Sequence, residues 1–179
     1  MSIPNIITLA RILIVPVVVW TIAIGQLGLA FMLFLAAAVS DAVDGFLAKR
    51  FGMKTDLGAY LDPLADKVLI VSIYVTLGIT SVIPLWIVIL VVSRDILIVG
   101  GVLLAWLVGH PIQIKPHWVS KLNTAAQILF ACLILGGLGF GLDVGILLTL
   151  VMWLVAALTL LSIAFYVAEW VRHMGAEEP

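Results

Sequence analysis

The chain has 179 residues and a net charge of −1; 64% of its residues are hydrophobic and only 11% are charged. Soluble domains are about 45–50% apolar and about 25% charged, so this composition excludes a soluble globular protein and indicates an integral membrane protein. Nine Lys and Arg residues against ten Asp and Glu residues exclude the basic surface of a nucleic-acid-binding protein, and the single cysteine excludes an internal disulfide.

Six apolar stretches occupy most of the chain. Each is close to the roughly 20 residues that a helix needs to cross a bilayer, and all are too long for membrane-spanning strands. The stretches cover residues 7–24, 27–48, 58–79, 83–107, 121–138 and 144–170. The sequence therefore predicts one all-α domain over residues 1–179, folded as a bundle of six transmembrane helices.

The loop charges predict the orientation of this bundle. Basic residues lie between the second and third stretches, between the fourth and fifth, and after the sixth: Lys49, Arg50, Lys54, Lys115, Lys121 and Arg172. The connections near residues 26, 81 and 139 contain no Lys or Arg. By the positive-inside rule, both termini and the two basic connections are expected in the cytoplasm.

Four aspartates lie at the predicted cytoplasmic ends of the second and third stretches. Asp41 and Asp44 are three residues apart, and Asp62 and Asp66 are four apart, so each pair shares one helix face. A short loop joins the two helices, so we expect the pairs to face each other. Carboxylates so close together must share protons or bind cations, and an all-oxygen cluster suits Mg²⁺, Mn²⁺ or Ca²⁺.

Small residues flank these acids, at Gly45, Ala48 and Gly58, and would leave room for a bulky ligand. Paired metal ions beside a cleft are typical of phosphoryl transfer, in which one carboxylate takes the proton of the attacking hydroxyl. The alternative is the ion path of a transporter. Transporter acids usually lie near the bilayer midplane within repeats, and this sequence has no internal repeat.

Residues 41–66 read D-A-V-D-G-F-L-A-K-R-F-G-M-K-T-D-L-G-A-Y-L-D-P-L-A-D. They resemble the signature of the CDP-alcohol phosphotransferases, D-x2-D-G-x2-A-R-x8-G-x3-D-x3-D, and depart from it only at Lys49, where the family usually has Arg. Lysine keeps the positive charge but loses the bidentate fork.

The resemblance implies the reaction and the ligands. The donor would be CDP-diacylglycerol, and its pyrophosphate would bridge two Mg²⁺ or Mn²⁺ ions held by Asp41, Asp44, Asp62 and Asp66. An acceptor hydroxyl would attack the lipid-proximal phosphorus and release CMP, with Asp66 as general base and Asp62 as the alternative. The residues implied to admit the nucleotide and pyrophosphate are Gly45, Ala48, Lys49 and Gly58. A homodimer in the bacterial inner (cytoplasmic) membrane, with its active site facing the cytoplasm, is also expected.

The opening residues 3–11, I-P-N-I-I-T-L-A-R, are similar to the start of bacterial phosphatidylglycerophosphate synthases and their cardiolipin-forming relatives. In those relatives the equivalent residues line the nucleotide-lipid site. The similarity therefore implies that Asn5, Thr8 and Arg11 bind CDP-diacylglycerol, and their spacing keeps them roughly on one side of the first helix.

Two segments of the second half concern the acceptor. S-R-D at residues 93–95 and K-P-H-W-V-S-K-L-N-T-A-A-Q at 115–127 are similar to the CMP-forming cardiolipin synthases. Glycerophosphate-using relatives tend to carry a second lysine where this chain has Asn123. Glycerol 3-phosphate has nearly two charges and would favour that extra cation, whereas phosphatidylglycerol needs it less.

The sequence therefore predicts phosphatidylglycerol as acceptor and cardiolipin as product, with phosphatidylglycerophosphate synthesis from glycerol 3-phosphate as the alternative. The residues predicted to bind the acceptor phosphate are Arg94, Lys115, Lys121 and Asn123. Arg94 and Asp95 lie in the middle of an apolar stretch, so a purely structural ion pair between helices is an equal alternative for them.

Overall fold

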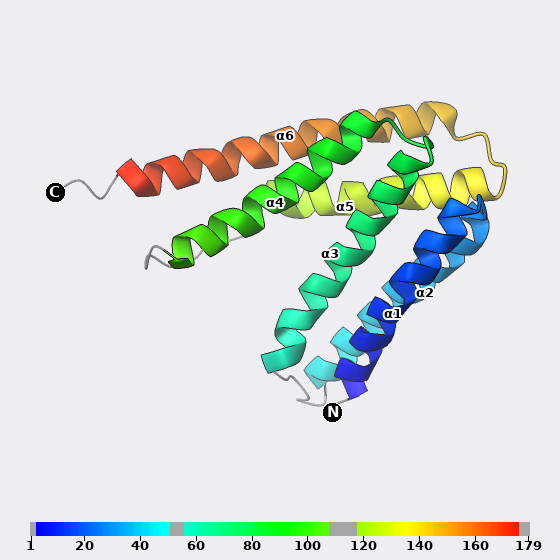
Figure 1. Cartoon of the computed structure of the whole chain (residues 1–179), viewed down its shortest axis with the longest axis horizontal. Helices are drawn as coiled ribbons and strands as arrows, with labels where there is room; N and C mark the ends of the chain where they lie inside the picture. Colours follow the sequence, from blue (N-terminus) through cyan, green and yellow to red (C-terminus); the bar gives the residue numbers. More distant parts are fainter. Residues whose placement is uncertain (1–2, 51–55, 108–117, 176–179) are drawn as a thin grey trace. The chain divides into compact units, whose positions relative to one another are not determined.

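The computed structural model describes residues 3–50, 56–107 and 118–175, with side chains described for 8–41, 65–100, 118–169 and 171. These residues are helical except at short turns, and none of them is in a strand (Figure 1). The elements are α1 (Ile3–Ala23), α2 (Leu27–Arg50), α3 (Asp56–Ile79), α4 (Leu85–Leu107), α5 (Trp118–Cys132), the π-helix η1 (Leu133–Leu138) and α6 (Gly145–Gly175).

Each predicted apolar stretch coincides with a helix, and the all-helical prediction is confirmed for the described residues. The fifth stretch differs in one respect, because α5 passes directly into η1 over its last six residues. Among the described residues, two stretches are long and apolar enough to cross a membrane, Trp118–Leu138 and Gly145–Glu169. Two shorter apolar helical stretches cover Thr8–Ala23 and Leu27–Asp41.

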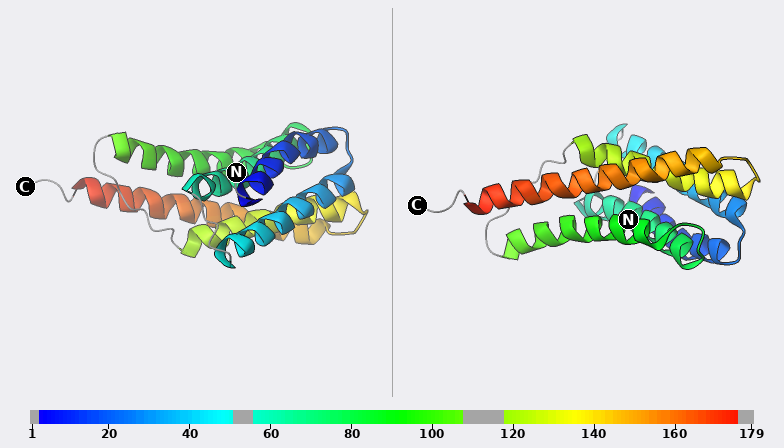
Figure 2. Two further views of the ribbon diagram at one scale, coloured as in Figure 1. Left: turned by 90° about the horizontal axis from the view of Figure 1, so that it is seen from below. Right: turned by 90° about the horizontal axis from the view of Figure 1, so that it is seen from above.

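The chain divides into two compact units. In the first, residues 1–83 and 131–144, α1 packs against both α2 and α3, and η1 packs against α2. Val18, Ile22, Ala30, Ile73 and Leu77 are among its fully or almost fully buried side chains. In the second, residues 84–130 and 145–179, α4 lies alongside α6 (Figure 2).

Three helix ends close in the same way. After α1, the N–H groups of Gly25 and Gln26 donate to carbonyls of the last turn, and Gly25 has a φ of 77°. This is the Schellman motif, which satisfies carbonyls that a helix end leaves without partners. Ser81 (φ 60°) and Gly141 (φ 67°) occupy the same left-handed position after α3 and η1.

Glycines allow α2 and the end of η1 to approach closely. A Cβ atom on Gly139 would lie 2.7 Å from the Cα of Gly28 and 2.8 Å from the carbonyl carbon of Leu27. Beside this contact, the rings of Phe31 and Phe140 meet edge to face with their centroids 5.9 Å apart. The contact requires glycine at position 139, because the atoms that a side chain would meet belong to the backbone.

We expect Gly139→Ala to lower the free energy of unfolding by about 1–3 kcal/mol, because the added methyl forces the backbones of α2 and η1 apart. Gly100→Ala in α4 is the control, since a Cβ there meets nothing within 4 Å. Removing a helical glycine should leave the stability unchanged or raise it by up to about 1 kcal/mol. Unfolding in detergent would measure both, and equal stability of the two variants would contradict the close contact.

Candidate active site

The first unit brings one arginine and two of the predicted aspartates together. Nη1 of Arg11, on α1, lies 2.7 Å from Oδ1 of Asp41 on α2 and 2.9 Å from Oδ1 of Asp66 on α3. Three helices therefore converge through their charged side chains on one guanidinium nitrogen. The expectation that acids of the second and third apolar stretches lie close together is met by this pair.

The pattern of α1 explains why Arg11 points inward. Val15, Val18 and Ile22 follow it at helical spacing, and all three side chains are buried, as is Thr8 one turn before it. Arg11 thus lies on the buried face that packs against α2 and α3. A buried guanidinium needs a counter-ion, and the two carboxylates supply it.

Exposure differs sharply across this cluster. The side chain of Arg11 is 1% exposed, whereas those of Asp41 and Asp66 are 41% and 51% exposed. In this described contact two carboxylates meet one guanidinium, and carboxylate oxygens are ligands that Mg²⁺ and Mn²⁺ prefer. The donor chemistry therefore fits a hard divalent cation. Within the described side chains no group of three or more potential ligands gathers. The side chains of Asp44 and Asp62 lie outside that set.

Several predicted site residues are placed only as parts of helices. The helix α1 includes Asn5, α2 includes Asp44, Gly45, Ala48 and Lys49, and α3 includes Gly58 and Asp62. Their side chains lie outside the described residues, and so does Lys115 altogether. The predicted roles of these residues in binding metal and nucleotide, and of Lys115 in binding the acceptor phosphate, remain predictions.

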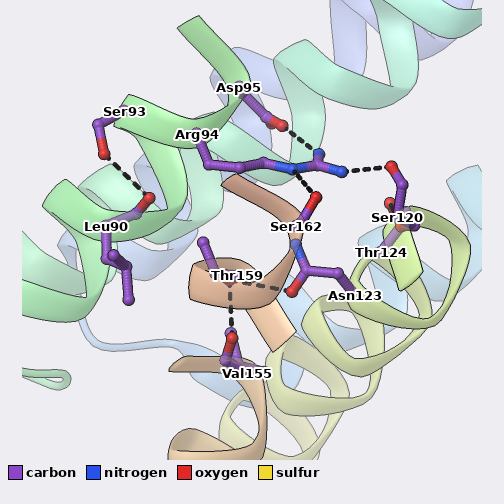
Figure 3. A network of polar contacts seen from close by, with 10 residues as sticks. All are labelled: Leu90, Ser93, Arg94, Asp95, Ser120, Asn123, Thr124, Val155, Thr159 and Ser162. Atoms are coloured by element: carbon purple, nitrogen blue, oxygen red, sulfur yellow. Dashed lines mark hydrogen bonds and ion pairs between the residues drawn. The ribbon is translucent and has the colours of Figure 1, made fainter. Parts of the chain in front are cut away.

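The second unit contains a buried polar network around Arg94 of α4 (Figure 3). Its Nη1 donates to Oδ1 of Asp95 at 2.6 Å, its Nε donates to Oγ of Ser162 on α6 at 3.2 Å, and its Nη2 donates to Oγ of Ser120 on α5. The side chains of Arg94 and Asp95 are 4% and 13% exposed. The arginine therefore ties three helices together, and its charge is offset by its neighbour in the sequence.

Asn123 of α5 lies in the same part of this unit and is completely buried. Oγ of Thr159 on α6 lies 2.9 Å from its Oδ1 and 2.7 Å from the carbonyl oxygen of Val155. Nδ2 of Asn123 has no hydrogen-bond partner among the described residues. A buried amide donor without a partner is costly and is a candidate contact for a ligand.

Lys121 does not join this network. It is exposed at the start of α5, and its Nζ lies 5.5 Å from the centre of the Trp118 ring, which is also exposed. The structure thus brings Arg94 and Asn123 into the buried interior of the second unit and leaves Lys121 outside it.

Comparison with known proteins identifies the family of the chain. The CDP-alcohol phosphatidyltransferase family matches residues 1–165, which include both clusters. The chain belongs to the CDP-alcohol phosphatidyltransferase family.

Three relatives of the chain carry different names. A rice protein named CDP-diacylglycerol–glycerol-3-phosphate 3-phosphatidyltransferase 1, chloroplastic, is 33% identical over 93% of this chain and 56% of its own length. The rat cardiolipin synthase (CMP-forming) is 30% identical over 92% of this chain and 59% of its own length. The *Bacillus subtilis* CDP-diacylglycerol–glycerol-3-phosphate 3-phosphatidyltransferase is 32% identical over 90% of this chain and 91% of its own length. The chain thus spans less than two thirds of the rice and rat proteins. The rice and Bacillus names include glycerol 3-phosphate, whereas the rat name gives cardiolipin as the product.

The sequence alone did not reveal the partners of the buried polar residues. It did not anticipate that Arg11 contacts Asp41 and Asp66, although an arginine within an apolar stretch needs an acidic partner. It also missed Thr159 and Ser162. These two are polar residues three apart in the apolar α6, and that spacing is the signal that could have found them.

Proposed function

We propose that this protein transfers the phosphatidyl group of CDP-diacylglycerol to a hydroxyl of phosphatidylglycerol, giving cardiolipin and CMP. The observation that carries the proposal is the convergence of Asp41 and Asp66, from two helices of the family signature, at one half-exposed cluster. Family membership supports the donor chemistry. The name of the rat relative, cardiolipin synthase (CMP-forming), supports the acceptor.

The proposed enzyme crosses the membrane six times, with both termini and its active site on the cytoplasmic side, in a bacterial inner membrane. Six helical stretches of 21 or more residues support the number of spans, α5 and η1 being taken together. At about 1.5 Å per residue, 21 residues reach about 30 Å, the thickness of the hydrocarbon core. The charged connections support the orientation. A homodimer belongs to the proposal through family resemblance alone.

The donor site of the proposal lies on α1, α2 and α3. Asp41, Asp44, Asp62 and Asp66 would hold Mg²⁺ or Mn²⁺, which supplies charge stabilisation to the pyrophosphate and the leaving group. Asn5, Thr8, Gly45, Ala48, Lys49 and Gly58 would bind the rest of CDP-diacylglycerol. Half-exposure of Asp41 and Asp66 supports this site, because a ligand can reach both carboxylates.

Asp66 is the proposed general base. The acceptor hydroxyl oxygen forms a bond to the lipid-proximal phosphorus, and the bond from that phosphorus to the oxygen bridging to CMP breaks. CMP leaves with the electron pair of that bond, and the hydroxyl proton passes to the Asp66 carboxylate. The side chain of Asp66 is 51% exposed and that of Asp41 is 41% exposed, and this greater exposure supports Asp66 as the base. Asp62 is the alternative.

The proposed acceptor site includes Arg94 and Asn123 in the second unit, with Lys115 and Lys121 as further cations for the acceptor phosphate. The three bonds of Arg94 to Asp95, Ser120 and Ser162 use three of its five N–H groups. The remaining two, with Nδ2 of Asn123, are donors of the kind that a monoanionic phosphodiester accepts from. Glycerol 3-phosphate is the alternative acceptor, supported by the names of the rice and *Bacillus* relatives.

Thr159→Val is expected to raise the KM for phosphatidylglycerol about fivefold, with the KM for CDP-diacylglycerol unchanged. The hydroxyl beside Oδ1 of Asn123 is lost, and one net hydrogen bond is worth about 1 kcal/mol. Thr124→Val is the matched control, because the exposed Thr124 hydroxyl donates to the Ser120 carbonyl of its own helix and, among the described residues, bonds no other helix. Equal KM values for phosphatidylglycerol in the two variants would show that Asn123 does not take part in acceptor binding.

CMP release from CDP-diacylglycerol by the purified protein tests the proposed reaction. We expect release only when both a divalent cation and an acceptor are present, measured by chromatography of the nucleotide. An ion-coupled transporter using the same acids would instead show uptake into proteoliposomes and release no CMP, and that result would overturn the proposal.

A further inference from the structure

We infer that Arg11 is a positioning residue for the cation-binding carboxylates and does not itself hold the phosphates of CDP-diacylglycerol. The inference rests on the proposed function, since it assigns a role within the proposed metal site. It departs from the role that the similarity of residues 3–11 to other synthases implies, and it is carried by the contacts of the Arg11 side chain.

The first step is the geometry of the contact. One nitrogen, Nη1, lies within 3 Å of both Asp41 and Asp66, at 2.7 and 2.9 Å. A guanidinium Nη atom carries two hydrogens in a fixed plane, so it can donate one to each carboxylate at the same time. The bridge therefore fixes the separation of two side chains that belong to different helices.

The second step is the direction of approach. Arg11 is 1% exposed, and the two carboxylates are 41% and 51% exposed, so the guanidinium reaches them from the interior of the first unit. A cation or a nucleotide arriving from solvent meets the exposed side of the carboxylates first. Arg11 thus lies behind the carboxylates, where it can orient them but is screened from a phosphate.

The third step is charge. In the described contact one guanidinium meets two carboxylates, so this contact by itself leaves negative charge that attracts a divalent cation. Groups that hydrogen-bond metal ligands from behind commonly change metal affinity by 10- to 100-fold when they are replaced. Lysine would keep the charge but lose the planar fork, so Arg11→Lys separates orientation from electrostatics.

The test is a titration of the purified protein in detergent with Mn²⁺, without nucleotide or lipid substrate, followed by electron paramagnetic resonance of free Mn²⁺. We expect Arg11→Lys to weaken Mn²⁺ binding about tenfold. Arg94→Lys is the matched control, the same change at a buried arginine of the second unit, and should bind Mn²⁺ as the wild type does. The metal-free unfolding temperature is recorded for each variant.

Unchanged Mn²⁺ affinity in Arg11→Lys, together with weaker binding of CDP-diacylglycerol, would overturn the inference. It would show that Arg11 binds the phosphates of CDP-diacylglycerol. An Arg11→Lys protein that folds only with added Mn²⁺ would support it, because arginine and cation would then stabilise the same carboxylates. If the variant is unfolded both with and without Mn²⁺, Arg11 has a structural role only, and the inference is overturned. Wild-type Mn²⁺ binding that Asp41→Asn leaves unchanged would instead refute the proposed metal site itself.

Discussion

Replacing Asp66 with asparagine is expected to reduce CMP release by at least about 100-fold. General bases contribute about 10²- to 10⁴-fold to a rate, and the amide of asparagine cannot take the proton of the acceptor hydroxyl. The amide oxygen can still accept from Arg11 Nη1, the contact made at 2.9 Å in the native protein, so the variant should remain folded. Initial rates with saturating CDP-diacylglycerol and phosphatidylglycerol would measure the loss.

Asp143→Asn is the matched control for this experiment. Asp143 is exposed on the turn between η1 and α6, and we expect its replacement to leave the rate unchanged. Full activity in Asp66→Asn would remove the assignment of this residue as base and leave Asp62 as the candidate. Loss of activity in both variants would point to a general effect of removing an acidic residue.

Replacing Arg94 with methionine is expected to lower the free energy of unfolding by about 3–5 kcal/mol, the usual cost of removing one partner of a buried ion pair. The change removes the ion pair with Asp95 and the bonds from α4 to Ser120 and Ser162. Methionine fills a similar volume, so the lower free energy of unfolding would reflect the lost polar contacts more than the creation of a cavity. Equilibrium unfolding in mixed detergent micelles would measure it.

Arg94→Lys distinguishes charge from geometry at the same position. Lysine can keep an ion pair with Asp95 but cannot reproduce the three-way fork, so we expect a smaller loss, about 1–2 kcal/mol. A methionine variant within about 0.5 kcal/mol of the wild type would show that the network around Arg94 does not hold the second unit together.

The helices could be predicted because their cause is local. Stretches of about 20 apolar residues have few alternatives to a helix in a bilayer, and each predicted stretch lies within a few residues of a helix in the structure. That Asp41 and Asp66 lie near one another, both beside Arg11, agrees with the helical spacing of the acids and the short loop between their helices. The passage from α5 into η1 was not predicted, because apolar composition does not distinguish an α-helix from a π-helix.

The partners of the buried polar residues could not be predicted, because they depend on contacts between distant parts of the chain. Arg94 bonds Ser162, 68 residues away, and Arg11 bonds Asp66, 55 residues away. Lys121 and Asn123 were grouped as one acceptor segment, yet one is exposed and the other completely buried. At about 100° per residue, positions two apart point to nearly opposite sides of a helix.

The most direct test of the proposed reaction is identification of its lipid product. Purified protein would be incubated with CDP-diacylglycerol, Mg²⁺ or Mn²⁺, and either phosphatidylglycerol or glycerol 3-phosphate, and the lipids analysed by mass spectrometry. We predict a four-chain product, cardiolipin, with phosphatidylglycerol only. Phosphatidylglycerophosphate formed only with glycerol 3-phosphate would contradict the proposed acceptor and the interpretation of Asn123, while keeping the donor site at Asp41 and Asp66.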